Sequence, residues 1–218
     1  MKITVNDITL YYERYGKGKP ILMIHGNTED HTIFDESIKE LANDYQVYAI
    51  DSRAHGKSDA CDVLDYEIMA EDMLAFINAL SIKKPIVYGY SDGGIIALHM
   101  AMKAQQTIDR IIISGANLNL FGFKLETFTE ILVHYLKTHS KYDRLMLKQK
   151  AIKNKDLQKI TIQTHILLGK NDCITKRQTN RMHKMIRGST LEIIDAEDHG
   201  SYIVHSKKLY EIMKKYLY

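Results

Sequence analysis

Cysteine is scarce in this chain of 218 residues, since only Cys61 and Cys173 occur and they form no Cys-x-x-Cys pair. This scarcity argues against a structural zinc site and against a disulfide scaffold, and both thiols are expected to be inert. Long apolar runs are absent as well. Because no stretch of 18 apolar residues occurs, no stable insertion into a membrane is expected.

Charge of one sign is also in short supply, because 30 Lys and Arg residues against 27 Asp and Glu residues leave a net charge of +3. That balance gives no reason to expect nucleic acid as a partner. The N-terminal stretch MKITVNDITLYYERYG lacks the apolar core of a signal peptide. With ordinary globular composition and no internal repeat, residues 1–218 are expected to form a single cytoplasmic domain.

The sequence does contain an alternation of strand and helix patterns. A β-hairpin is predicted from two alternating segments that the turn pair Asn6-Asp7 separates. Later apolar runs are typical of strands buried on both faces, and apolar residues at helical spacing predict helices between them. The predicted strands are 2–6, 8–14, 20–26, 45–51, 85–90, 109–116, 164–169 and 190–196, and the predicted helices are 32–44, 65–80, 93–104, 176–187 and 202–216.

This order of elements predicts an α/β fold with a mainly parallel twisted sheet and helices on both faces. In an open sheet of this kind, ligands bind at the carboxyl ends of the strands. Ser91, Asp172 and His199 each follow a different predicted strand at that edge. The fold is therefore expected to bring a serine, a carboxylate and a histidine together although they are far apart in the sequence.

Ser91 lies at the centre of the sequence Gly89-Tyr90-Ser91-Asp92-Gly93, between a predicted strand and a predicted helix. This G-x-S-x-G spacing is typical of a sharp turn in which Cβ atoms two residues from the serine would collide, so glycine is needed there. The strained serine backbone lifts the hydroxyl clear of the sheet. The adjacent helix N-terminus favours negative charge, so one geometry predicts a nucleophile and part of an oxyanion hole.

These motifs resemble those of the α/β-hydrolase fold superfamily, and the likeness extends over most of the chain. The order Ser91, Asp172, His199 is the family's order of nucleophile, acid and histidine. The segment HGN at 25–27 is similar to the family's oxyanion loop. The segments LLGKND and DAEDHGSY are similar to the turn that carries the acid and to the histidine loop.

The segment DSRAHGKSD at 51–59 is similar to the family's D-x-R-G-x-G-x-S segment, with Ala54-His55 in place of a glycine and a variable residue. Two departures concern the second half of the chain. The proline that commonly precedes the strand before the acid is replaced around Gln163-Thr164, and the preceding connection is short. His25 is interpreted as structural, because it can organise the oxyanion loop by hydrogen bonds.

The resemblance implies a serine hydrolase. Ser91 attacks the substrate, His199 accepts the serine proton, and Asp172 holds the imidazole tautomer. The backbone N–H groups of Asn27 and Asp92 are expected to bind the oxyanion. Water then releases the acid from an acyl-enzyme, so no metal and no organic cofactor is required.

Residues 118–161 connect two predicted sheet strands and are too many for an ordinary loop. The family carries a cap at this place, and the helical patterning predicts a small lid of one or two helices over Ser91. Its aromatic side chains are expected to line an apolar substrate pocket together with Tyr90, or else to pack on the sheet as core. The candidate pocket residues are Tyr90, Phe121, Phe123, Phe128 and Tyr135.

The segment 137–159 contains eight Lys or Arg residues and two acidic residues. Such a surplus can steer anionic substrates or contact a membrane surface. The more ordinary interpretation is a solvated helix face.

Three functions are compatible with these residues. A carboxylesterase-like serine hydrolase of small-molecule esters or thioesters is favoured. A peptidase or amidase uses the same triad, but it usually needs a pocket for a substrate charge, which the sequence does not identify. Some proteins of this fold act chiefly as ligand receptors or signalling partners, and measured turnover separates them from the enzymes.

Overall fold

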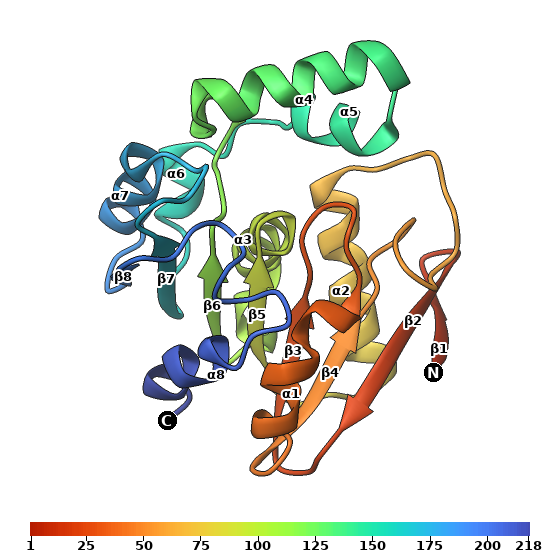
Figure 1. The fold of residues 1–218 in the computed structure, drawn as a ribbon. Coiled ribbons are helices and arrows are strands. Elements are labelled where there is room, and N and C mark those ends of the chain that lie inside the picture. Colours follow the sequence, from red (N-terminus) through yellow and green to blue (C-terminus); the bar gives the residue numbers. More distant parts are fainter.

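Residues 1–218 are described by a computed structural model, in which one eight-stranded sheet runs through the molecule (Figure 1). The order of strands is β1-β2-β4-β3-β5-β6-β7-β8. The strands are β1 Lys2–Val5, β2 Ile8–Tyr15, β3 Lys19–Ile24, β4 Tyr45–Ile50, β5 Ile86–Tyr90, β6 Arg110–Ser114, β7 Gln163–Gly169 and β8 Thr190–Ile194. The helices are η1 His31–Phe34, α1 Asp35–Leu41, α2 Tyr66–Ala79, α3 Asp92–Ala104, η2 Gln105–Thr107, η3 Leu120–Gly122, α4 Leu125–Thr138, α5 Lys141–Leu147, α6 Asn154–Leu157, α7 Lys176–Met185, α8 Lys208–Met213 and η4 Lys214–Tyr216.

The predicted α/β fold with its N-terminal hairpin is confirmed. Strand β2 pairs in antiparallel fashion with both β1 and β4, and all the remaining pairs are parallel. Asn6 and Asp7 both have positive φ, at 46° and 61°. Those values are typical of the two-residue type I′ turn that matches the twist of a hairpin.

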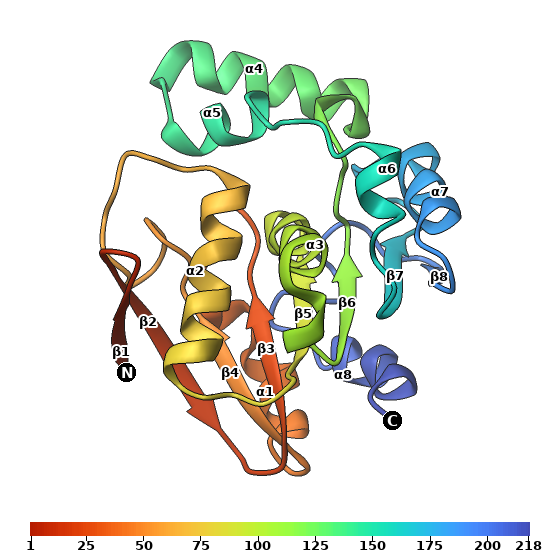
Figure 2. The same cartoon turned by 180° about the vertical axis from the view of Figure 1, so that it is seen from behind.

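Helices cover both faces of the sheet because the central strands bury alternate side chains on opposite sides. In β3, Leu22 and Ile24 belong to a core cluster with α2 and α3, whereas Ile21 and Met23 belong to a second cluster with α1 and α8. Figures 1 and 2 show these two helical layers from opposite sides. Each fully buried aliphatic side chain contributes roughly 1.5–3 kcal/mol to folding.

The order in which strands are added to the sheet reverses at β3, since β4 and β5 lie on opposite sides of it. This reversal determines where the site lies. The connection from β3 to β4 contains α1 on one face, whereas the connection from β4 to β5 contains α2 on the other (Figures 1 and 2). Since β3 and β5 are hydrogen-bonded neighbours, their carboxyl ends border a crevice between loops that leave in opposite directions. The segments that follow β3 and β5 begin with His25 and Ser91.

The predicted helix over 202–216 is wrong in its first half. Tyr202 and Ile203 are buried in a turn, where the N–H groups of Ile203 and Val204 both donate to the Gly200 carbonyl. His205 then adopts a positive φ of 48°, which a right-handed helix does not accommodate. Helix α8 therefore begins only at Lys208, and none of the helices is long and apolar enough to cross a bilayer.

Candidate active site

Ser91 occupies a strained turn between β5 and α3. Its φ of 52° and ψ of −115° lie outside the usual regions for a residue with a side chain. A Cβ on Gly89 would lie 2.2 Å from the Gly93 carbonyl oxygen, and one on Gly93 would lie 2.1 Å from the Ile24 carbonyl oxygen. Both positions therefore need glycine, and the serine hydroxyl is presented at the start of α3.

Three loops bring Ser91, His199 and Asp172 into a line. The Ser91 Oγ and His199 Nε2 atoms are 3.0 Å apart, and His199 Nδ1 is 2.8 Å from Asp172 Oδ1. Asp172 Oδ1 also accepts a hydrogen bond from the backbone N–H of Ile174 at 2.8 Å. The aspartate is 1% exposed, whereas the imidazole side chain is 25% exposed. The geometry allows proton transfer between serine and imidazole, with the carboxylate orienting the ring.

Gly115, which follows β6, makes room for the imidazole. Its φ is +61°, and a Cβ there would lie 2.7 Å from His199 Cε1 and 2.8 Å from His199 Nδ1. The histidine loop is held from the other side, where Asn171 N–H donates to the Glu197 carbonyl at 2.9 Å. The position of His199 therefore depends on backbone contacts from two neighbouring strand ends.

The environment of His199 sets its basicity. Burial is the largest single effect and acts to lower the pKa of the ring, but the interactions with Asp172 and Cys173 together outweigh it. The pKa of His199 is therefore raised above the ordinary value for histidine. A raised pKa makes the imidazole a stronger proton acceptor once it is neutral.

His25 organises the loop after β3, in agreement with its structural interpretation. Its Nδ1 lies 2.7 Å from the Gly26 carbonyl oxygen, and its Nε2 accepts a hydrogen bond from Ser52 N–H at 3.0 Å. Burial lowers the pKa of His25 to about 4, which keeps the ring neutral. Because both ring nitrogens already have partners, His25 is not free to exchange a proton with a substrate.

Asp92 directly follows the nucleophile, and Asn27 directly follows Gly26, whose Cβ position would lie 3.1 Å from Ser91 Cβ. Asp92 is the first residue of α3, where a backbone N–H has no partner within the helix. The Asn27 side chain donates from Nδ2 to the Tyr142 carbonyl oxygen at 3.2 Å, which connects this loop to helix α5. The Asp92 carboxyl points elsewhere, since its Oδ1 accepts from the Tyr66 hydroxyl at 2.8 Å.

Glu29 is a site residue that the sequence analysis missed. Its Oε2 accepts a hydrogen bond from Gly26 N–H at 3.0 Å. From the point where a Gly26 side chain would begin, Glu29 Oε2 is 2.6 Å away and Ser91 Cβ is 3.1 Å away. Burial raises the pKa of Glu29 to about 7, so its charge changes near neutral pH. The sequence feature that could have indicated this residue is an acidic residue three positions after Gly26 in the segment HGNTED.

Cys173 is a second missed residue. It follows Asp172 directly and is half-buried, and its sulfur lies within 4.8 Å of ligand atoms of both Asp172 and His199. Hydrogen bonding to this thiol also acts to raise the pKa of His199. The expectation that this cysteine is inert was drawn from composition, which does not report the distance to the imidazole.

The Asp30, His31 and Asp51 side chains form another cluster of potential metal ligands. Here His31 Nδ1 lies 2.6 Å from Asp51 Oδ1, and the same carboxylate accepts from the backbone N–H groups of His31 and Lys57 at 2.8 Å each. The Asp51 oxygens thus accept hydrogen bonds that stabilise the loop after β4. We interpret this cluster as structural.

The five candidate pocket residues lie in different environments in the structure. The Tyr90 ring is buried, with its centroid 5.1 Å from that of His199, and the Phe123 backbone bridges to Ile174 on the acid loop. Phe128 and Tyr135 are half-buried on α4. Phe121 as a pocket residue is wrong, because it is 87% exposed: η3 turns its side chain toward Arg177 and Arg181 on the surface.

Helices α4 and α5 lie above the carboxyl edge of the sheet (Figure 1). Of the residues in α4, only Ile131 is buried, and Leu125, Val133 and Leu136 are exposed. Helix α5 makes the closer contacts, because the Tyr142 hydroxyl donates to the Ala54 carbonyl at 2.6 Å. The apolar spacing in α4 therefore predicted a helix correctly, but apart from Ile131 the apolar residues that were expected to be buried are only half-buried or exposed.

Half of the basic residues in segment 137–159 have partners within the chain. Lys141 and Arg144 donate to the carbonyl oxygens of Cys61 and Asp62, at 2.9 Å and 3.0 Å. Lys150 and Lys159 form ion pairs with acidic side chains. The contacts of Lys141, Arg144 and Lys150 tie the β6–β7 connection to the start of α2 and the loop before it, whereas Lys159 pairs within the connection.

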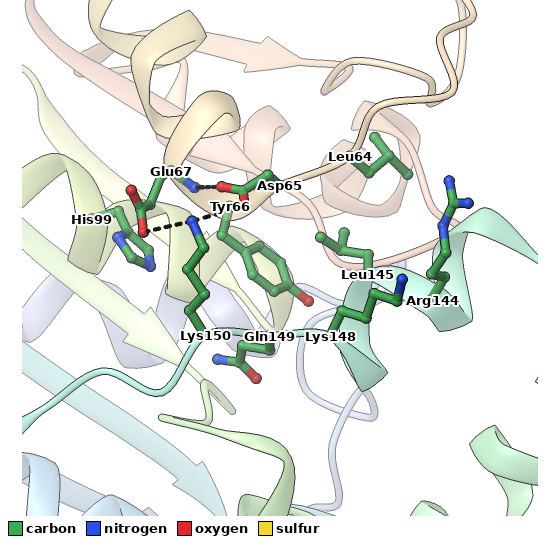
Figure 3. Close-up of a pocket in the computed structure, with 10 residues that line it drawn as sticks. All are labelled: Leu64, Asp65, Tyr66, Glu67, His99, Arg144, Leu145, Lys148, Gln149 and Lys150. Carbon is green, nitrogen blue, oxygen red and sulfur yellow. Dashed lines mark hydrogen bonds and ion pairs between the residues drawn. The ribbon is translucent and has the colours of Figure 1, made fainter.

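A surface hollow of about 280 Å³ lies between the start of α2, α3 and residues 144–150 at the end of α5 and after it (Figure 3). Tyr66 lines it, and the hydroxyl of this residue reaches Asp92. Ser91 and His199 are not among the residues that line the hollow. The lining residues are Leu64, Asp65, Tyr66, Glu67, His99, Arg144, Leu145, Lys148, Gln149 and Lys150.

Comparison with known proteins adds a family to this geometry. A family model described as the alpha/beta hydrolase fold matches residues 19–162. The chain is 34% identical over 116 residues to the AB hydrolase superfamily protein YisY of Bacillus subtilis, which is 52% of this chain and 43% of that protein. It is 26% identical over 142 residues to a pimeloyl-[acyl-carrier protein] methyl ester esterase of Vibrio atlanticus, covering 60% and 54%. The chain thus spans about half the length of these curated relatives.

Solved structures show the same fold over the whole chain. An esterase from Exiguobacterium antarcticum, EaEST, superposes with a TM-score of 0.83 at 23% identity, covering 99% of this chain and 98% of that one. This likeness concerns the arrangement of the strands and helices.

Proposed function

This chain belongs to the alpha/beta hydrolase fold family, and we propose that it is a serine hydrolase that cleaves small-molecule carboxylic esters or thioesters. The observation that carries the proposal is the line from Ser91 Oγ through the His199 ring to Asp172 Oδ1, with separations of 3.0 Å and 2.8 Å. The esterase activity named for the Vibrio relative supports the same reaction class.

In the proposed mechanism, Ser91 Oγ attacks the ester carbonyl while His199 Nε2 takes the hydroxyl proton. Asp172 keeps Nδ1 protonated and stabilises the imidazolium that forms. The N–H groups of Asn27 and Asp92 bind the oxyanion, and each such donor is worth about 3 kcal/mol in the transition state. The protonated imidazole then gives its proton to the leaving alcohol, and water attacks the acyl-enzyme by the same route.

We also propose that residues 118–161 act as a lid. The hydrogen bond from Asn27 to the Tyr142 carbonyl supports this role, because it joins α5 to the loop that would hold the oxyanion. The exposed apolar side chains of α4 are compatible with a helix that is held mainly by α5 beneath it.

The test is a series of p-nitrophenyl esters of increasing acyl length, assayed with the native protein and the Ser91→Ala variant. We expect the variant to lose at least about 10⁴-fold in kcat and to keep its fold, because only a hydroxyl group is lost at a half-buried position. A fluorophosphonate probe should label Ser91 in the native protein. Equal rates in both proteins, or labelling at another serine, would refute the proposal.

A further inference from the structure

The loops after β7 and β8 bring three different metal-ligating groups close together. The carboxylate of Asp172, the thiol of Cys173 and a ring nitrogen of His199 each offer one atom, and these atoms all lie within 4.8 Å of one another. We propose that these three residues form an inhibitory binding site for Zn²⁺ and similar thiophilic divalent cations.

The donor set suits this class of ion. Zn²⁺ in proteins is bound by cysteine sulfur, histidine nitrogen and carboxylate oxygen. Its bond lengths place ligand atoms about 3.3–3.8 Å apart in a tetrahedral site. The present atoms lie within 4.8 Å of one another, so shifts of at most about 1 Å would bring them to that spacing, and Nδ1 would part from Asp172 Oδ1 as the metal enters. Because hard ions such as Mg²⁺ prefer oxygen, the thiol and imidazole select against them.

An unpartnered carboxylate oxygen supports the site independently. Asp172 is 1% exposed, and its Oδ1 already serves His199 and the Ile174 N–H. Its Oδ2 is buried and has no hydrogen-bond partner. A buried carboxylate oxygen without a donor is costly, and a cation on this carboxylate would offset that cost. The half-exposed thiol and imidazole leave a path from solvent.

Metal binding would act on the tautomer of His199. Since Nε2 faces Ser91 at 3.0 Å and Nδ1 faces Asp172 at 2.8 Å, the proposal places the metal on Nδ1. When the cation binds, the Cys173 thiol releases its proton to solvent, and the proton on Nδ1 is transferred to Nε2. Sulfur and Nδ1 then bind the metal, and one proton is released overall. An imidazole protonated at Nε2 cannot accept the serine proton, so hydrolysis stops.

The chain offers a matched control, because its only other cysteine, Cys61, lies outside this cluster. The native protein, Cys173→Ser and Cys61→Ser are titrated with ZnCl₂ in competition with a chelating dye. They are also titrated with CoCl₂, for which a sulfur ligand produces charge-transfer absorption. We expect stoichiometric binding and the sulfur–cobalt band in the native and Cys61→Ser proteins. In Cys173→Ser we expect the band to be lost and zinc affinity to fall at least about 10-fold, the minimum typical of disturbing a metal site.

Inhibition is measured on p-nitrophenyl acetate relative to the metal-free rate of each protein, and only this part rests on the proposed function. The rates of the native and Cys61→Ser proteins should fall as zinc binds, and EDTA should restore them. Equal zinc affinity in all three proteins, or none in the native one, overturns the site, and binding without loss of rate overturns the inhibitory role. If no protein hydrolyses the ester, the proposed function fails, while the dye and cobalt titrations still decide the site.

Discussion

The catalytic edge and the β6–β7 connection differ in how their side chains are held. At the catalytic edge, Gly89, Gly93 and Gly115 lie so close to neighbouring atoms that no side chain fits. In the connection, α4 has one buried residue and exposes large apolar side chains. A position enforced by backbone contacts tolerates little change, whereas a surface helix tolerates more. The variants below test this contrast from the largest expected effect to the smallest.

Asp172→Asn tests the buried end of the catalytic line. Without the carboxylate the imidazole loses its preferred tautomer, and kcat on p-nitrophenyl acetate should fall by about 10⁴-fold. In the native protein the base must be neutral, so the rate should fall as pH drops through the raised pKa of His199. Asparagine removes the negative charge of Asp172, which contributes to that increase, so the residual rate should follow a lower apparent pKa. A pH–rate profile of unchanged midpoint would contradict this account.

Gly115→Ala tests whether backbone crowding places the histidine. The new Cβ would meet the imidazole at less than 3 Å, and a displacement of about 1 Å typically costs on the order of 10²-fold in rate. Gly188→Ala is the matched control, because Gly188 also has a positive φ, at 76°, but nothing lies within 4 Å of its Cβ position. Both variants should lose stability because of the positive φ, Gly115→Ala should lose more because of the added clash, and only Gly115→Ala should lose activity. Equal activity in the two would show that the contact does not matter.

Glu29→Gln tests a charge next to the nucleophile. Burial raises the pKa of Glu29 to about 7, so the carboxyl is neutral below that pH and becomes negative as pH rises. A negative charge near the developing oxyanion opposes catalysis. The variant keeps an oxygen for Gly26 N–H, and its kcat/KM on acetate esters should exceed the native value several-fold above pH 7 and match it at pH 5–6. The change Glu36→Gln on α1, where the carboxylate pairs with Lys39, should have no effect, and identical profiles for all three proteins would exclude a role for this charge.

Phe128→Ala tests the connection itself. A buried core phenylalanine typically costs 3–5 kcal/mol on truncation, but Phe128 is half-buried on a mostly exposed helix. We expect the free energy of unfolding to fall by about 1 kcal/mol, with a shift in ester chain-length preference and little change on acetate. Val133→Ala on the same helix serves as the control, because its side chain is exposed. A loss of several kcal/mol with unchanged preference would show that Phe128 is core.

The sequence predicted the features that depend on local rules. Short apolar runs predicted the buried strands, the Asn6-Asp7 pair predicted the hairpin, and the glycine spacing predicted the nucleophile turn. Each pattern reflects steric constraints within a few residues. The order of alternating strands and helices then predicted a parallel sheet, whose carboxyl edge gathers Ser91, Asp172 and His199. Their mutual distances depend on β5, β7 and β8 lying in one sheet.

Only the tertiary structure determined the contacts between segments that share no sequence pattern. The crowding of His199 by Gly115, the thiol of Cys173 behind the imidazole and the Glu29 carboxyl beside Ser91 come from different loops. Contacts between distant segments also explain the errors. An amphipathic pattern predicted helix α4, but the surface that α4 packs against depends on where α5 lies. Phe121 faces solvent because η3 turns its side chain outward. Periodicity encodes which side chains share a face, and packing between distant segments determines what that face meets.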